Sequence, residues 1–183
     1  YNGGQDGVVF KMTPDLSAMT WATYIGTSGD ESAYGLRLDS EYNVYVTGST
    51  NSIDFPTTTN AANPNYIGGE IDAFILKFKH DGTTLLASSF FGSDGKDQSF
   101  FLDIDNSGDV YIYGQNSETI NITPSCYGVA NSSQFIAKLN ADLDTVLWQT
   151  TVGTGSISIS IWDNYDLVPV AFMVDVCKHI YIS

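Results

Sequence analysis

The amino-acid sequence predicts an all-β fold assembled from repeated four-stranded antiparallel units. The first observation is an internal repeat: segment 21–26 recurs as 87–92 and as 148–153, and segment 43–48 recurs as 109–114. A repeat of this length is typical of stacked supersecondary units. The second observation is that short runs rich in Val, Ile, Thr, Tyr and Phe alternate with turn residues, as strands do. The third is that Gly, Asn, Pro and Ser interrupt these runs too often for long helices.

The second copy of the repeat shows the unit most clearly. Its predicted strands cover residues 73–79, 84–91, 98–105 and 110–115. Asp81-Gly82 suits a tight hairpin, loop 92–97 is longer and polar, and turn 106–108 is tight and contains glycine. The first copy follows the same plan, with strands expected over 7–12, 19–25, 33–39 and 44–47. The third copy is longer and irregular between residues 153 and 170.

The fourth strand of each copy indicates how the sheets are buried. Val44 and Val46 point to one face of the strand, while Tyr45 and Thr47 point to the other. Both faces are therefore partly apolar, whereas a sheet covered on one side alternates apolar with polar residues. A repeated four-stranded unit that packs on both faces is typical of a β-propeller blade. The predicted fold class is an all-β chain of about three consecutive β-propeller blades, the last one incomplete.

The 183 residues are expected to form a fragment of one β-propeller domain. The expected order is repeat 1 over about 5–49, connector 50–71, repeat 2 over about 72–115, connector 116–133 and repeat 3 over about 134–183. Pro residues exclude a central strand from the connectors, which we expect to lie between blades. Three blades cannot close a ring. We therefore expect the remainder of the propeller, or a capping protein, to cover the open ends. A stable, monodisperse 183-residue monomer would contradict this expectation.

Composition narrows the classes of partner. Seven Lys and Arg stand against 21 Asp and Glu, for a net charge of −14, which disfavours nucleic acids and anionic membranes. No apolar run is long enough to span a membrane. The excess of carboxylates fits either a solvated surface or calcium binding outside the cell. The abundance of Ser, Thr, Asn, Gly and Tyr with little Lys fits an extracellular protein.

Four segments carry a resemblance to a known family. They are Thr23-Tyr24-Ile25-Gly26, Asp39 followed by residues 43–49, Asp54-Phe55-Pro56-Thr57, and residues 72–78. They resemble the SBBP β-propeller repeat, which is common in large cell-surface and secreted proteins of Bacteroidetes. Many of those proteins are associated with gliding motility and leave the cell by type IX secretion. The resemblance implies a propeller, a surface location, and adhesion or binding roles. It supplies no catalytic residue.

One segment is a candidate calcium loop. In Asp103-Ile104-Asp105-Asn106-Ser107-Gly108-Asp109, acids stand at positions 1, 3 and 7 and Gly at position 6, as in the first half of such a loop. The late Glu is missing, because position 12 is Gly114. Only Asp39, Asp105 and Asp175 recur in all copies. A recurring Asp before a tight turn is better interpreted as a cap that accepts backbone N–H groups.

A recurring lysine is the natural partner for that recurring aspartate. Lys11, Lys77 and Lys138 occupy the first strand of each copy. Because strands alternate in direction, the end of the first strand and the end of the third lie on one rim. We therefore expect a structural Lys–Asp ion pair, within or between blades. A ring of lysines that binds an anion is the alternative, and the acidic surroundings disfavour it.

The opposite rim carries loops 27–32 and 93–98 together with the connectors. Recognition is commonly carried by loops on a rigid scaffold, so we expect binding here; a merely solvated acidic rim is the alternative.

Cys126 lies in a connector and Cys177 in a turn on the other rim. We therefore expect no disulfide, although two cysteines in a secreted chain favour one.

The sequence offers no catalytic site, cofactor site or metal site. His80 and His179 lie in or next to turns, outside any metal-ligand spacing, and no nucleophile elbow, zinc motif or phosphate loop occurs. We therefore expect a non-enzymatic surface module for adhesion, ligand binding or scaffolding within a larger secreted protein. The alternative is part of a secreted, glycosidase-like hydrolase whose catalytic groups lie partly outside this segment. A screen against glycans separates the two, because only a hydrolase releases products.

Overall fold

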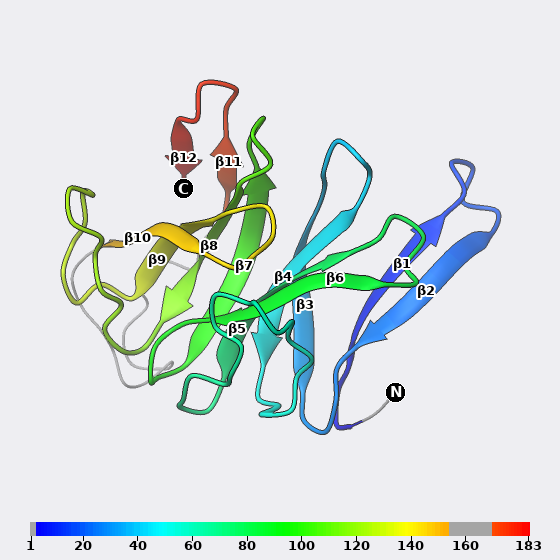
Figure 1. Cartoon of the computed structure of the whole chain (residues 1–183), viewed down its shortest axis with the longest axis horizontal. Helices are drawn as coiled ribbons and strands as arrows, with labels where there is room; N and C mark the ends of the chain where they lie inside the picture. Colours follow the sequence, from blue (N-terminus) through cyan, green and yellow to red (C-terminus); the bar gives the residue numbers. More distant parts are fainter. Residues whose placement is uncertain (1–2, 154–169) are drawn as a thin grey trace.

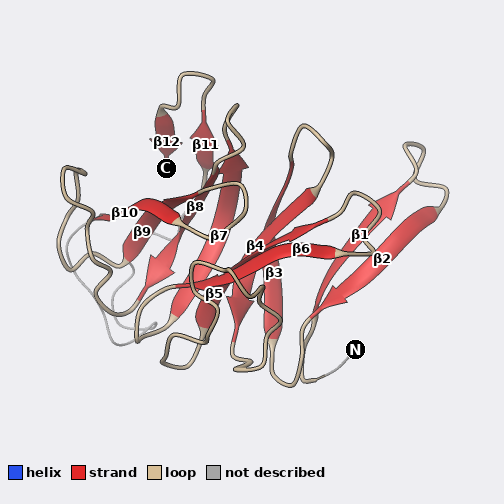
Figure 2. Cartoon of the chain, viewed as in Figure 1, coloured by secondary structure: helices blue, strands red, loops and turns tan. Residues whose placement is uncertain are grey.

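The computed structural model describes residues 3–153 and 170–183, and every regular element in them is a strand (Figures 1 and 2). One four-stranded antiparallel sheet contains β3 (Glu31–Leu38), β4 (Val44–Thr50), β5 (Asp72–Phe78) and β6 (Leu85–Phe91). A second contains β7 (Asp97–Ile104), β8 (Val110–Asn116), β9 (Gln134–Leu139) and β10 (Val146–Val152). Two-stranded sheets flank them: β1 (Gly7–Met12) with β2 (Met19–Ile25), and β11 (Phe172–Val174) with β12 (Ile180–Ile182). The two four-stranded sheets are β-propeller blades, as predicted. The expected row of about three blades with only the last incomplete differs from the described residues, which form two complete blades with a two-stranded sheet at each end.

The blades are shifted by two strands against the sequence repeat. Sheet β3–β6 joins the last two strands of repeat 1 to the first two strands of repeat 2, because β4 pairs with β5 along its whole length. The prediction that each repeat forms one blade, with connectors 50–71 and 116–133 between blades, is therefore wrong. Both connectors join neighbouring strands of one sheet, and the shorter loops 26–30 and 92–96 pass from sheet to sheet.

The connectors are long because they travel around the outer edge of the sheet they belong to. The Thr58 N–H donates to a carbonyl of β6 at 3.1 Å. In the second blade, the N–H groups of Thr123 and Val129 donate to carbonyls of β10 at 2.9 and 2.8 Å. An unpaired edge strand invites association with other chains. Each connector thus covers the outermost strand of its own blade.

The core lies between consecutive sheets, and each four-stranded sheet is packed on both faces as expected. Val44 and Val46 of β4 belong to the cluster shared with β1 and β2, while Tyr45 belongs to the cluster shared with β7 and β8. Gly48 lies in β4 between the neighbouring strands β3 and β5 of the same sheet. A Cβ at Gly48 would lie 1.9 Å from a carbonyl oxygen of β3 and 2.7 Å from the Phe74 ring, so only glycine fits.

The two ends of the row of blades expose apolar side chains among the described residues. Val8 and Phe10 of β1 are 49% and 54% exposed, whereas Phe74 and Leu76, which stand 66 residues later in β5, are buried. At the other end Tyr181 of β12 is 52% exposed, although the equivalent Tyr45 is buried. No helix among the described residues is long and apolar enough to cross a membrane.

The strands place their connections on two rims (Figure 1). The turn rim consists of the hairpin turns 39–43, 105–109 and 175–179, which follow β3, β7 and β11. The loop rim consists of loops 26–30 and 92–96, with the ends of the connectors beside them. The two rims differ in the charged and polar side chains that they hold.

Candidate functional site

The recurring aspartates of the turn rim cap their hairpin turns, as predicted. Each accepts the backbone N–H groups two and four residues further on through Oδ1. The two distances are 2.9 and 2.8 Å at Asp39, 2.8 and 3.2 Å at Asp105, and 2.8 and 2.9 Å at Asp175. The three turns therefore share one backbone geometry, in which residues i, i+2 and i+4 surround the carboxylate.

Two of the three recurring lysines reach these carboxylates, so the predicted ion pair is confirmed for Lys77 and Lys138. Lys77 Nζ lies 3.3 Å from Asp39, and Lys138 Nζ lies 3.0 Å from Asp105 and 2.8 Å from Asp109. Each lysine comes from the repeat that follows its aspartate, because the two repeats share one sheet. Both ammonium groups also lie over a tyrosine ring of the adjacent strand, 4.9 and 4.8 Å from its centroid.

The Lys138 cluster is largely buried, and charge pairing dominates its electrostatics. Burial raises the pKa of Asp105, but hydrogen bonds from Lys138, Ser107 and other donors outweigh it and hold this pKa well below its usual range. Burial alone would lower the pKa of Lys138. Its bonds to Asp109, Tyr111 and Asp105 outweigh burial and raise this pKa above its usual range. Both groups are therefore charged at neutral pH.

The candidate calcium loop 103–109 is not arranged around one ion. Asp103 lies on β7, where its Oδ2 accepts the Val174 N–H at 2.8 Å and its Oδ1 lies 3.4 Å from Arg37 Nε. Asp105 and Asp109 instead converge on the Lys138 ammonium. The segment is a capped hairpin turn, which is the alternative that the sequence favours.

A hollow of about 940 Å³ opens between the two four-stranded sheets near the turn rim. Most of its wall is polar: Glu41, Asn43, Thr57, Thr58, Thr59, Asn60, Lys77, Lys79, Asp142 and Asp144, with Leu86 and Ala87 as the apolar part. The hydrogen bond from Tyr45 Oη to the Ala141 carbonyl, 3.0 Å long, ties the two sheets together here. Hydroxyl, amide and carboxylate groups side by side can bind a polyhydroxylated ligand.

The loop rim, which the sequence favours for binding, is tied to the connectors. The hydroxyls of Thr27 and Ser28 donate to Asp54 Oδ1 at 2.9 and 2.8 Å, and the Lys96 N–H donates to Ser117 Oγ at 2.6 Å. These contacts fix the loops on the scaffold. Whether this rim binds a ligand stays a prediction.

The loop rim also holds two buried carboxyl groups with raised pKa values, which were not singled out from the sequence. Asp72 and Asp97 are both fully buried. Burial raises the pKa of Asp97 to about 7, where the bonds from Ser93 oppose it and the charges of Asp72 and Asp94 add to it. Burial likewise raises the pKa of Asp72 to about 6. A recurrence was the available signal: Asp72 stands 66 residues after Asp6, and Asp97 stands 66 residues after Glu31.

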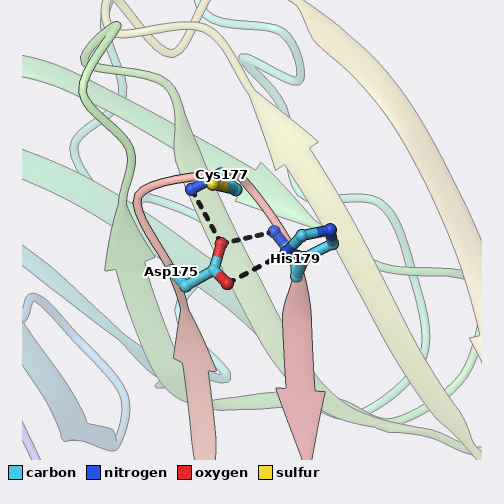
Figure 3. A group of neighbouring side chains, drawn as sticks. All are labelled: Asp175, Cys177 and His179. Atoms are coloured by element: carbon cyan, nitrogen blue, oxygen red, sulfur yellow. Dashed lines mark hydrogen bonds and ion pairs between the residues drawn. The ribbon is translucent and has the colours of Figure 1, made fainter.

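The turn 175–179 groups three side chains of types that can bind a metal ion (Figure 3). One ligand atom each from Asp175, Cys177 and His179 lies within 4.8 Å of the others. His179, which the sequence places outside any metal-ligand spacing, thus lies beside a carboxylate and a thiol. The missed signal is the alternation Asp-x-Cys-x-His in a hairpin turn. Cys126 and Cys177 are both free, as expected, and His80 is not part of this group.

Comparison with known proteins agrees with this architecture. Residues 20–56 match the family model of the β-propeller repeat SBBP. The chain contains an SBBP-type repeat. The matched segment runs from β2 through β4 into the connector, so it crosses from one blade to the next as the sequence repeat does. No curated protein matches the chain.

Proposed function

We propose that this chain is a non-catalytic module of a larger secreted or cell-surface protein, which binds a ligand on a rigid propeller scaffold. The polar hollow between the two complete blades is the observation that carries the proposal. Its residues come from the connector, from two strands and from turns of both blades. Such sites between rigid elements hold binding groups in fixed positions.

The chemistry of the hollow favours a glycan as ligand. Thr59, Asn60 and Asp142 are exposed, lie on its wall and offer a hydroxyl, an amide and a carboxylate. Lys79 adds an ammonium group at the same wall. A neutral or basic polysaccharide fits this surface better than an anionic one, because the chain carries a net charge of −14. Adhesion or scaffolding on such a polymer is the role that follows.

The location and export route rest on the repeat family. The SBBP match and the acidic composition support a bacterial cell-surface or extracellular setting. Gliding motility and type IX secretion are the finer proposals that the resemblance carries. Proteinase accessibility on intact cells that express the protein tests the surface location.

The structural partner that we propose is the rest of the propeller or a protein that caps it. Val8 and Phe10 at one end, and Tyr181 and Ile182 at the other, are exposed at positions that the complete blades bury or pair. Lys11 makes no ion pair with any described residue, although its equivalents Lys77 and Lys138 do. A further blade at each end would cover these groups.

A glycan screen with matched variants tests the proposed function. We expect the chain to bind a polysaccharide without releasing products, and Asn60→Ala with Asp142→Ala to abolish binding. Asp94→Ala, an exposed change on the loop rim, serves as the control and is expected to bind normally. Loss of binding in the control alone would move the site to the loop rim. Release of products would favour the hydrolase alternative, and absence of binding across the screen would contradict the proposal.

A further inference from the structure

The three hairpin turns of the turn rim share one geometry, in which an aspartate caps the turn and its second carboxylate oxygen stays available for another contact. Their aspartate fixes the backbone, so the side chains two and four residues further on stand beside the carboxylate. In the first turn Asn43 Nδ2 donates to Asp39 Oδ2 at 2.9 Å. In the second turn Asp105 and Asp109 hold the Lys138 ammonium at 3.0 and 2.8 Å. In both turns Oδ2 of the capping aspartate therefore contacts a cationic or donor group.

The third turn keeps this geometry but changes the chemistry. The positions that carry Glu41 and Asn43 in the first turn carry Cys177 and His179 in the third. Among the described residues, no lysine reaches Asp175. Lys178 points instead to the second turn, with Nζ 3.2 Å from Asp105 Oδ2 and 2.9 Å from Ser107 Oγ. The carboxylate therefore faces a thiol and an imidazole instead of an ammonium group.

Carboxylate, thiolate and imidazole are the three side-chain ligand types that Zn²⁺ takes in proteins. A thiolate also selects against Ca²⁺ and Mg²⁺, which prefer oxygen ligands. All three residues lie on an exposed turn, so a metal ion can reach them without opening the fold (Figure 3). Their ligand atoms lie within 4.8 Å of one another. Metal–ligand bonds of about 2.0–2.3 Å in a tetrahedral site require roughly 3.5 Å between the ligand atoms. Side-chain movements of about 1 Å would therefore close the site.

We propose that Asp175, Cys177 and His179 form a three-ligand surface site for Zn²⁺, with water as the fourth ligand. The Asp175 Oδ1 keeps its two backbone N–H bonds, so the turn stays in place. Asp175 Oδ2 exchanges its contacts with His179 Nδ1 (2.9 Å) and Tyr181 Oη (3.2 Å) for the metal. The Cys177 thiol loses its proton to solvent as the sulfur–metal bond forms, so binding weakens as pH falls. The site does not depend on the glycan-binding proposal.

Titration of the reduced 183-residue chain with Co²⁺, followed by displacement with Zn²⁺, tests the site. Cobalt bound to a thiolate in a tetrahedral site gives sulfur-to-metal charge-transfer absorption and intense visible bands. We expect both in the unmodified protein, with loss of both on addition of Zn²⁺. Absence of charge-transfer absorption would overturn the proposal, because it would mean that no thiolate binds the metal.

Paired variants place the metal on this turn. Cys177→Ser and His179→Asn are each expected to weaken Zn²⁺ binding by at least about tenfold. Cys126→Ser and His80→Gln remove the other thiol and the other imidazole, and they should leave binding unchanged. Equal loss in the Cys126 variant would contradict the site. His179→Asn places at this position the residue type that the first turn carries. If the thermal unfolding curve of this variant matches that of the unmodified protein in chelator, the turn still folds.

Discussion

The two rims of the blades bury aspartate in opposite ways. On the turn rim, Asp105 faces the Lys138 ammonium, and its pKa lies below the usual range. On the loop rim, Asp72 and Asp97 are fully buried near each other's charge, and burial raises their pKa values to about 6 and about 7. The comparison teaches that the same side chain loses its proton well below the usual pH on one rim and keeps it to a higher pH than usual on the other. The contributions of the two rims to folding stability therefore change in opposite directions as pH rises.

Removal of the buried lysine should have the largest effect. Lys138→Met leaves Asp105 and Asp109 without their shared ammonium in a buried setting, which costs about 3–5 kcal/mol of unfolding free energy in such pairs. Lys178, 3.2 Å from Asp105, partly compensates, so we expect the lower end of this range. Urea unfolding measures it. Lys138→Met combined with Asp105→Asn should recover part of the loss, and no recovery would contradict an electrostatic cause.

The pH dependence of the loop rim comes next in size. The pKa of Asp97 is raised from 3.8 to about 7 in the folded chain, so the folded state binds this proton more tightly than the unfolded state. Its contribution to stability is therefore complete below pH of about 4 and is lost as pH rises to about 7. Asp97→Asn should flatten this fall, which amounts to a few kcal/mol. Unfolding curves at pH 4, 5.5 and 7 for both proteins test it, and parallel pH profiles would contradict the assignment.

The first turn should be less sensitive than the second. Lys77 contacts one carboxylate, Asp39, at 3.3 Å, and both side chains keep some exposure. Burial raises the pKa of Asp39, but bonds from Asn43 and other donors outweigh it and lower this pKa overall, so the carboxylate remains supported without the lysine. Lys77→Met is expected to cost about 1–2 kcal/mol of unfolding free energy. A loss equal to that of Lys138→Met would show that the number of carboxylates does not matter.

The pair Arg37–Asp103 is expected to contribute least. The Arg37 side chain is 49% exposed, the Asp103 side chain is 16% exposed, and Arg37 Nε lies 3.4 Å from Asp103 Oδ1. An ion pair with one solvent-exposed partner contributes little, so Arg37→Ala should change the unfolding free energy by less than about 1 kcal/mol. A larger loss by urea unfolding would mean that Asp103 needs this partner to hold β11 through the Val174 N–H.

Much of the fold could be predicted from the sequence, but the pairing of strands could not. The period-2 pattern and the turn residues located nearly every strand, and the recurring Lys and Asp predicted the ion pairs. The predicted grouping of strands into blades was wrong because both possible groupings satisfy the same periodic pattern. The deciding contact is β4 with β5 across a long connector, and no local signal in residues 51–71 shows that this connector returns to the adjacent position.

The candidate sites were less predictable because they depend on what lies beside each residue. Aspartate usually lies at the surface, and only the burial of Asp97 in the loop rim raises its pKa to about 7. The hollow joins Thr57 of a connector to Asp142 of the next blade, which are far apart in the sequence. The sequence shows that Cys177 and His179 are present, but their proximity to Asp175 follows from the geometry of the turn.

The two-strand offset between repeat and blade has a consequence for the history of such chains. A gene duplication that copies one repeat inserts the last two strands of one blade and the first two of the next. Each inserted half finds a complementary half already present, since every β4-type strand pairs with a β5-type strand of the next repeat. The number of blades can therefore grow or shrink by one in a single recombination event, and no sheet within the row is left half built.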